Sequence, residues 1–302
     1  MKYRFYLSTT CASSDHLSDA VRELTGHGFH HIELSGHLTY QHNFEAKVLD
    51  LHHRGVHFLI HHYCPPSKSP FVLNIASASE EIRERSLEVL QKGHDLNRRL
   101  GGPFCAVHGG HNIDMEPKMK NNHFIVDQGT LRDRGKAEEQ FYANLQEVMT
   151  TIFSDGERLA VENLATKSRT ENYSLLSDPD QILKYLQFSR RYDNLGFLLD
   201  LGHLQVAAHN LEFDGLTLAR RILREYPDKV YGLHLSDNDG TFDDHQVHSP
   251  DSWQWDFLEE FSAVLHGRPV VFEWGRKTNS PETFKAGIAM LKRRFGAQAC
   301  IS

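Results

Sequence analysis

Short runs of apolar residues recur along the whole chain and predict eight β-strands. The runs are continuously apolar rather than alternating, which is typical of parallel strands that are covered by helices. Segments with apolar residues at helical spacing separate them, so strands and helices alternate from one end of the chain to the other. The predicted strands are residues 3–9, 30–35, 56–61, 103–108, 158–163, 196–201, 230–235 and 269–274.

The segments between these runs have the start and stop signals of helices. Residues 77–102 begin with capping-box spacing and end in a pair of glycines, and residues 177–189 and 280–296 begin with Ser or Asp before a Pro. Eight strand–helix units in 302 residues predict an α/β fold, a (β/α)₈ TIM barrel that forms a single domain over residues 1–302. The alternative is an open doubly wound sheet, but no Gly-rich phosphate-binding motif follows the first strand.

Side chains that can bind a metal end six consecutive runs, from the third to the eighth. In a barrel, the carboxyl ends of the strands converge on one mouth, where active sites lie. A carboxylate buried there without a partner would cost several kcal/mol, so a shared cation is expected. The sequence therefore predicts a metal site at the mouth. The residues are His61, His108, Glu162, Asp200 with His203, His234 and Glu273.

Two connections, residues 109–132 and 236–254, are long for a compact barrel and are expected to be functional loops. The second contains "SDNDGTFDDHQVHSP", in which carboxylates and imidazoles are dense just after a strand ends. By itself this pattern fits either a solvated loop rich in turn formers or one wall of the metal site. Glu33 and Ser35, at the end of the second run, are expected to hydrogen-bond the barrel rim, and His94, in a helical stretch, to be solvated.

These strand ends resemble those of the xylose isomerase-like TIM-barrel superfamily, which includes sugar isomerases and epimerases and the endonuclease IV-type apurinic/apyrimidinic endonucleases. The resemblance implies that the loop after the seventh strand is a wall of the metal site, and it leaves open whether one, two or three ions bind and whether they are zinc or manganese. In the sugar enzymes, one divalent ion is held at positions that match Glu162, Asp200, His234 and Glu273. In the endonucleases, three zinc ions have nine ligands, and the added five match His61, His108, His203, Asp243 and His245.

Two chemistries fit these residues. In a sugar or sugar-derivative isomerase or epimerase, Glu162 and Glu273 would hold the ion and transfer a proton next to a metal-polarised carbonyl, with His203, His62 and Trp274 as candidate substrate contacts. The alternative is a multinuclear zinc phosphoesterase, which the nine-residue match favours. We favour the isomerase or epimerase, because acidic relatives that do not bind DNA are commonly of that kind. A metal-binding barrel without catalysis is ranked last, since it explains neither long loop.

Composition limits the partners and the location. The formal net charge is −7, so no general basic field attracts nucleic acid or an anionic membrane. The cysteines Cys11, Cys64, Cys105 and Cys300 are scattered, without metal-type pairing, which suits a reducing compartment. No apolar stretch approaches the roughly 18 residues of a membrane span, and the N-terminus lacks a long apolar segment. We therefore expect a cytoplasmic protein that acts on a small carbohydrate; the sequence does not define its oligomeric state.

Overall fold

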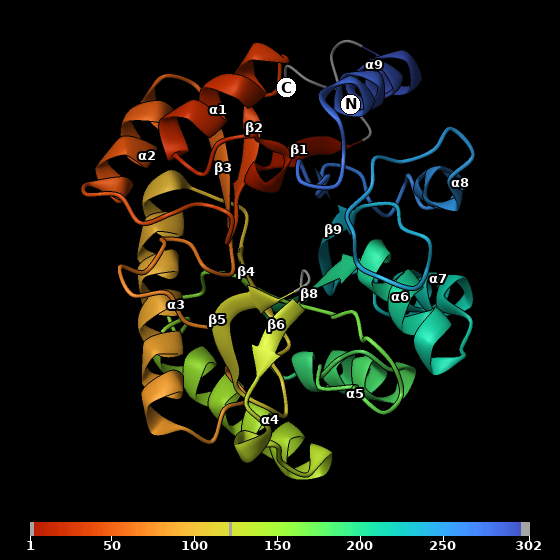
Figure 1. The fold of residues 1–302 in the computed structure, drawn as a ribbon. Helices are drawn as coiled ribbons and strands as arrows, with labels where there is room; N and C mark the ends of the chain where they lie inside the picture. The colour runs from red at the N-terminus through yellow and green to blue at the C-terminus, as the bar shows by residue number, and fades with distance from the viewer. Residues whose placement is uncertain (1–2, 121–122, 297–302) are drawn as a thin grey trace.

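Eight parallel strands form a closed barrel in the computed structural model, which describes residues 3–120 and 123–296 (Figure 1). Their order around the barrel is β1-β10-β9-β8-β7-β4-β3-β2. Every strand lies within two residues of a predicted run, so the (β/α)₈ prediction is confirmed; Cys300 lies outside the described residues. The strands are β1 (Arg4–Ser8), β2 (His31–Leu34), β3 (His57–His61), β4 (Cys105–His108), β7 (Leu159–Glu162), β8 (Leu195–Asp200), β9 (Val230–Leu235) and β10 (Pro269–Phe272).

Helices surround the barrel in a ring (Figure 1). Their ends follow the sequence signals: the Ser79 hydroxyl accepts a hydrogen bond from the Ile82 N–H at the start of α3, and Gly101 ends that helix with φ 62°, a conformation that glycine adopts without strain. Among the residues described, no helix has both the length and the apolar character needed to cross a membrane. The helices are α1 (Leu17–Gly26), α2 (Phe44–His53), α3 (Glu80–Leu100), α4 (Arg134–Thr151), α5 (Pro179–Ser189), α6 (Leu201–Leu211), α7 (Gly215–Glu225), α8 (Trp253–Glu260) and α9 (Pro281–Phe295).

The first long connection contains an antiparallel hairpin of β5 (Met115–Lys120) and β6 (His123–Val126). Its base is fixed by Asp114, whose carboxylate accepts hydrogen bonds from Asn74 Nδ2 and Ser77 Oγ, both at 2.9 Å. The sequence predicted a long functional loop at this place and no strands. The structure has an anchored hairpin at this place instead of an irregular loop.

The second long connection runs without a regular strand through residues 236–252, all of which the structure describes. Its base is closed by a bridge between Asp237 and Gln246, whose backbone groups exchange hydrogen bonds of 3.0 and 2.8 Å. Residues 238–245 therefore form a loop whose two ends are held together by this pair. We call residues 236–252 the β9 loop.

Two layers of opposite character fill the barrel interior. Because side chains alternate between the two faces of a strand, the next inward residue lies two positions further along it. Two positions beyond Leu59, Ala106, Ala160, Leu198 and Val271 lie His61, His108, Glu162, Asp200 and Glu273. The metal-competent side chains therefore stand directly above an apolar floor. This floor consists of Tyr6, Leu59, Phe104, Ala106, Ala160, Leu198, Tyr231 and Val271.

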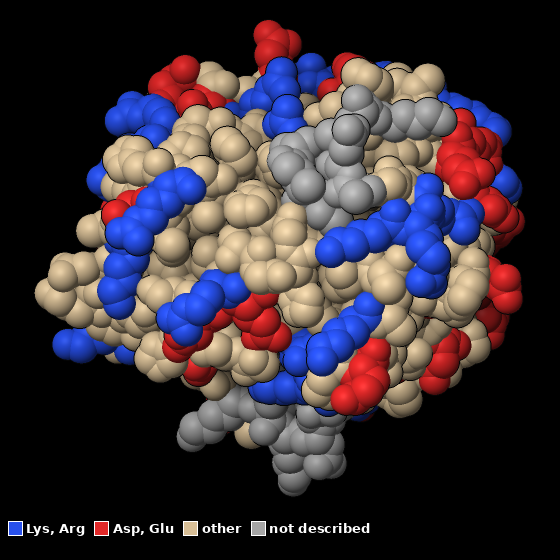
Figure 2. Space-filling model, turned by 90° about the horizontal axis from the view of Figure 1, so that it is seen from above, with Lys and Arg blue, Asp and Glu red and all other residues tan. Residues whose placement is uncertain are grey.

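The outer surface has a mixed charge. On the face shown in Figure 2, Lys and Arg side chains are interspersed with Asp and Glu. Many of these charges are paired along or between helices, as in the ion pair of Arg83 with Glu147 at 3.1 Å and that of Arg220 with Glu260 at 2.8 Å. Surface pairs of this kind contribute little to stability, about 0–1 kcal/mol each. The distinctive electrostatics of the protein are inside the barrel.

Candidate metal centre

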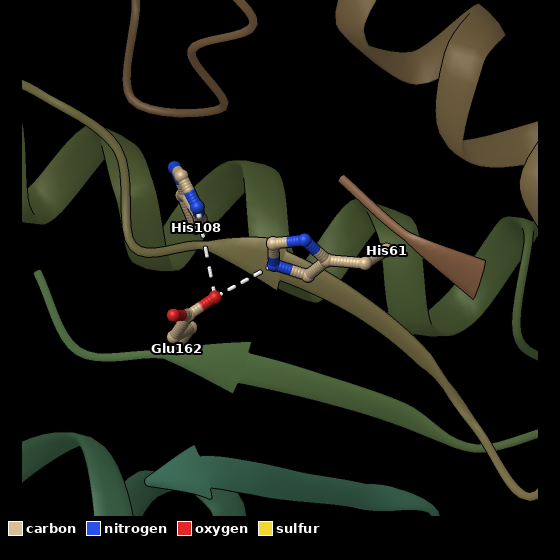
Figure 3. Close-up of side chains that lie close together, drawn as sticks. All are labelled: His61, His108 and Glu162. Carbon is tan, nitrogen blue, oxygen red and sulfur yellow. Dashed lines mark hydrogen bonds and ion pairs between the residues drawn. The ribbon is translucent and has the colours of Figure 1, made fainter. Parts of the chain in front are cut away.

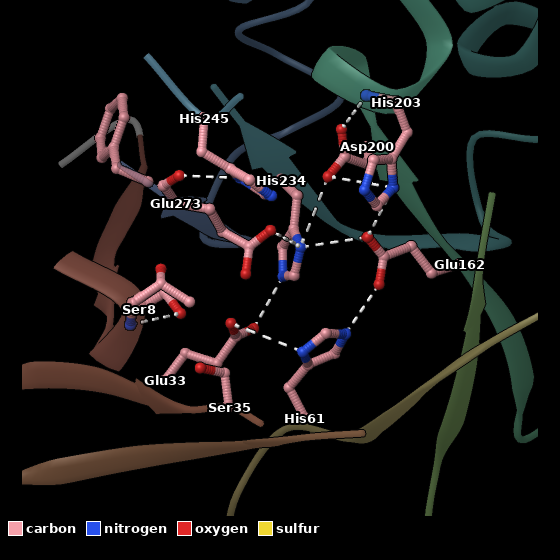
Figure 4. Close-up of polar contacts among 12 residues, drawn as sticks. Ser8, Glu33, Ser35, His61, Glu162, Asp200, His203, His234, His245 and Glu273 are labelled. Carbon is pink, nitrogen blue, oxygen red and sulfur yellow. Dashed lines mark hydrogen bonds and ion pairs between the residues drawn. The ribbon is translucent and has the colours of Figure 1, made fainter. Parts of the chain in front are cut away.

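All nine side chains that the sequence analysis singled out as metal ligands lie together at the mouth of the barrel, and they form three adjoining groups. Within each group, ligand atoms from all members lie within 4.8 Å of one another. We call them the central group, the histidine group and the loop group. The central group is Glu162, Asp200, His234 and Glu273; the histidine group is His61, His108 and Glu162; and the loop group is His203, Asp243 and His245. Figure 4 shows the residues of the central group with His61, His203 and His245. A further set of close ligand atoms, from Glu33, His61 and Glu273, adds Glu33 to these residues.

The central group converges on one imidazole nitrogen. His234 Nδ1 lies 3.1 Å from Glu273 Oε2, 3.3 Å from Glu162 Oε1 and 3.7 Å from Asp200 Oδ2. All four side chains are buried. Among the described residues, Glu162 Oε1, Asp200 Oδ2 and His234 Nδ1 have no hydrogen-bond partner. Buried polar atoms without partners are costly, and one cation coordinated by all of them would remove that cost. The residues of this group therefore fit a divalent metal ion.

Glu162 also belongs to the histidine group (Figure 3). Its second oxygen, Oε2, lies 2.7 Å from His61 Nε2 and 3.6 Å from His108 Nε2. The two oxygens of one carboxylate thus face two different groups of ligand atoms. A carboxylate in this position can bridge two ions. Burial lowers the pKa of His108 to about 3, so this imidazole is neutral and able to bind a metal at pH 7.

The β9 loop supplies two of the three members of the loop group. Asp243 Oδ2 lies 3.1 Å from His203 Nε2 and 3.3 Å from His245 Nε2. The other oxygen, Asp243 Oδ1, is buried and has no hydrogen-bond partner in the part of the chain that the structure describes. The carboxylate between two imidazole nitrogens is a ligand set that suits zinc. The β9 loop is therefore a wall of the candidate centre.

Hydrogen bonds on the far side of three imidazoles determine which nitrogen faces the centre. A carbonyl or carboxylate oxygen can only accept, so the ring nitrogen next to it must donate a hydrogen. His203 Nδ1 lies 2.9 Å from the Asn163 carbonyl oxygen, and His245 Nδ1 lies 3.0 Å from that of Glu273. His234 Nε2 lies 2.7 Å from Glu33 Oε2. Each remaining nitrogen therefore faces the centre, where a metal ion can take the place of its proton, as in metal-binding histidines generally.

The D-x-x-H segment at the end of β8 places two ligands through helix-capping geometry. Asp200 is the N-cap of α6, and its Oδ1 accepts a hydrogen bond of 2.6 Å from the backbone N–H of His203. Asn163 fixes Asp200 from the neighbouring strand, because its side chain bonds both the backbone N–H and the carbonyl oxygen of Asp200 at 2.9 Å. One oxygen of Asp200 is thus used in the cap, and the other, Oδ2, is available to the central group.

The buried charges shift one another's protonation. Burial raises the pKa of Asp200 to about 7, against the opposing effect of His203 and His234 and together with the carboxylates of Glu162 and Glu273. Burial lowers the pKa of His234, but Glu273, Glu33 and Glu162 outweigh burial and hold this pKa well above its ordinary value. The centre therefore holds protons near neutral pH where a cation would bind, and metal binding is expected to release them.

Two further residues, His62 and Trp274, were predicted to contact the substrate. His62 borders the centre, and Trp274 does not. His62 is buried and stacks on His108, with ring centroids 3.7 Å apart and planes at 20°. Its Nδ1 accepts a hydrogen bond from the His108 backbone N–H at 3.3 Å. Trp274 is a correction to the sequence analysis, because its side chain is fully buried in the core and its indole N–H donates to His248 Nδ1 at 2.9 Å. Trp274 does not line the mouth.

Two further residues differ from expectation. Glu33 faces the barrel interior with no exposed surface, rather than the rim, and bonds His234. Its signal in the sequence is a single carboxylate within the otherwise apolar "IEL" of the second run. His94 is buried rather than solvated, and its Nε2 lies 3.0 Å from Asp155 Oδ1.

Comparisons with known proteins agree with this fold. A family profile described as xylose isomerase-like TIM barrel matches residues 16–294. A probable endonuclease 4 from Carboxydothermus hydrogenoformans is 25% identical over 174 residues, which are 56% of this chain and 52% of that protein, so the match spans about half of the relative.

Solved structures with the same fold include an epimerase-like protein and an AP endonuclease. A D-tagatose 3-epimerase-like protein has a TM-score of 0.68 and 18% identity, with 96% of this chain and 99% of that chain covered. An AP endonuclease, family 2, from Brucella melitensis has a TM-score of 0.63 and 15% identity, with 96% and 98% covered. At these identities the likeness shows the shared fold.

Proposed function

The chain belongs to the xylose isomerase-like TIM-barrel family, and we propose that it is a divalent-metal-dependent phosphoester hydrolase with a multinuclear centre. The observation behind this proposal is the presence of three ligand groups at one mouth, two of which share Glu162. A centre for a single ion would not need the histidine group and the loop group.

The number and type of ligands favour several ions. One octahedral ion accepts about six ligands, whereas nine side chains converge here, five of them imidazoles. Imidazole-rich sets suit zinc better than magnesium or manganese. The four carboxylates among the candidate ligands, three of them buried, and the buried Glu33 would together with three dications have a net charge of +1. Such a centre would attract an anionic phosphoryl group.

The metal ions and the protein would contribute different parts of this chemistry. Divalent ions bound here would supply Lewis acidity, which polarises a phosphoryl oxygen and lowers the pKa of water. The chain itself fixes the geometry: Glu162 holds the central and histidine groups at a constant spacing, and Asp243 does the same for the two imidazoles of the loop group. The apolar floor excludes water from beneath the centre, and a dry site strengthens every charge interaction within it.

The isomerase or epimerase predicted from the sequence is the second candidate. It is supported by the central group, in which Glu162 and Glu273 both lie within 3.3 Å of His234 Nδ1. Proton transfer to and from carbon requires a carboxylate oxygen that is free to act as a base. Because Glu162 Oε2 is already 2.7 Å from His61, this oxygen is engaged by the histidine group. The hydrolase therefore accounts for more of the geometry.

The charge distribution supports a small substrate rather than a nucleic acid. Cations on the loop after β7 are paired with anions: Lys167 Nζ lies 2.5 Å from Glu171 and Arg169 lies 2.7 Å from Glu212. Nucleic-acid binding depends on Lys and Arg that are free to neutralise phosphates. With a net charge of −7, the protein better suits a small phosphorylated carbohydrate.

Metal analysis and a pair of assays test this proposal. Two or three equivalents of zinc by elemental emission, with phosphate release from an aryl phosphate or diester, would support the hydrolase. The same metal-loaded sample is incubated with a panel of ketoses in deuterium oxide and followed by NMR. Deuterium incorporation next to a carbonyl, without phosphate release, would reject the hydrolase in favour of the isomerase or epimerase.

A further inference from the structure

We propose that Glu33 is a positioning residue that couples the central group to the histidine group. Glu33 lies on β2 and is not one of the nine ligands predicted from the sequence, although its carboxylate also lies in a set with ligand atoms of His61 and Glu273, all within 4.8 Å of one another. Its Oε2 lies 2.7 Å from His234 Nε2, and its Oε1 lies 3.9 Å from His61 Nδ1. Glu33 and His234 have no exposed surface, and the His61 side chain is 5% exposed.

These contacts close a ring of four side chains in which carboxylates and imidazoles alternate (Figure 4). From Glu33 the ring passes to His61, whose Nε2 lies 2.7 Å from Glu162, and then to His234, whose Nδ1 lies 3.3 Å from Glu162. Glu33 and Glu162 thus contact the same two imidazoles from opposite sides. Glu162 is placed to contact the ions, and Glu33 contacts the imidazoles on their other nitrogens.

The contact with His234 sets the tautomer of that ring. A carboxylate is only an acceptor, so His234 Nε2 must donate the hydrogen, and Nδ1 is the nitrogen that can give its lone pair to an ion in the central group. Without Glu33, the ring could rotate or bear its hydrogen on Nδ1, and either change removes the lone pair from the centre. In a buried site such a charge-assisted bond is strong, because no water competes for it.

The contact with His61 is longer and forms the second half of the coupling. Glu33 Oε1 and His61 Nδ1 are both buried and lack hydrogen-bond partners within the described parts of the chain. These two atoms lie 3.9 Å apart, so each can serve as the polar partner of the other. When His61 binds a metal through Nε2, its Nδ1 bears the hydrogen and faces Glu33. An ion bound in one of the two groups would therefore fix the position of the Glu33 carboxylate. The same carboxylate orients the imidazole of the other group.

Zinc binding, rather than turnover, tests this inference, which rests on the proposed multinuclear centre. Zinc affinity is measured by competition with a chromophoric chelator, and cobalt(II) absorption reports the ligand geometry. We expect Glu33→Ala to weaken zinc binding about 10- to 100-fold in the central and histidine groups and to change the cobalt spectrum, because such outer contacts typically affect metal affinity by that much. Glu33→Gln keeps an oxygen acceptor for His234 and should lose less affinity. The loop group does not contact Glu33, so its ion should remain.

Asp155→Asn is the matched control. Asp155 also bonds a buried imidazole, that of His94 at 3.0 Å, but neither residue belongs to a ligand group. This variant should bind zinc like the wild type. If Glu33→Ala fails to fold, Glu33→Gln still tests the coupling, and wild-type zinc affinity with an unchanged cobalt spectrum in the folded variants would overturn it. A wild-type protein that binds zinc but releases no phosphate would reject the hydrolase and leave the role of Glu33 intact.

Discussion

His61 Nε2 lies 2.7 Å from Glu162 Oε2, and the other oxygen of the same carboxylate faces His234. We therefore expect Glu162→Gln to disturb two ion sites with one substitution. Zinc content should fall by more than one equivalent, and phosphoester hydrolysis should fall on the order of 100-fold or more. Elemental emission and a chromogenic assay measure both. Glu147→Gln, on the outer face of α4, is the control, and an equal loss in both variants would contradict the prediction.

Removal of metal should destabilise the fold. The central group then keeps three carboxylates in a buried site, where unpaired charges are costly. One site with zinc at 100 times its dissociation constant stabilises by about 2.7 kcal/mol, which for a chain of this size corresponds to about 4 °C in Tm. Calorimetry with and without a chelator measures the shift. An unchanged Tm would show that the groups do not bind metal in the folded state.

Asp243→Asn should affect the loop group selectively. Asp243 is the carboxylate between His203 and His245, so the variant is expected to lose one zinc equivalent and retain the others. Zinc titration followed by elemental analysis gives the count. Loss of every ion would contradict the prediction, because it would show that the three groups do not bind zinc independently. Asp239→Asn, in the same loop but outside the ligand groups, should keep full occupancy.

Acid should destabilise the protein partly through His31, away from the metal centre. Burial, followed by the charges of His57 and Arg4, lowers the pKa of His31 to about 4. The unfolded chain binds this proton at a higher pH, with a pKa near 6.5, so stability is lost as the pH falls from about 6.5 toward 4. After allowance for solvent screening, we expect this group to lower the free energy of unfolding by about 1 kcal/mol between pH 7 and pH 5. Urea denaturation at both pH values should show a smaller loss in His31→Gln than in the wild type.

The strands were predictable because each is a short apolar run between helical segments, and burial on both faces leaves that pattern in the sequence. The ligand candidates at and just after the strand ends were predictable because the carboxyl ends of parallel strands meet at one mouth, whereas Asp243 and His245 followed only from the family resemblance. Strand alternation also explains the error at Trp274: since Glu273 points inward, its neighbour must point outward into the helix layer.

Other features depend on contacts that no local pattern records. Glu33 and His234 are 201 positions apart in the sequence, and their hydrogen bond exists only because the barrel closes. The β5–β6 hairpin was missed because its base is held by Asn74 and Ser77, which belong to the loop after β3. Periodicity within residues 109–132 could not reveal those partners.

The ligands are divided unequally between the two halves of the barrel. The chain from β7 onward contains the complete central and loop groups, whereas the first half of the chain adds His61 and His108 to the candidate ligands. Loss of those two histidines would leave a complete four-residue group. An ancestral barrel with one ion could therefore acquire further ions by substitutions at the ends of β3 and β4, without reconstruction of the original site.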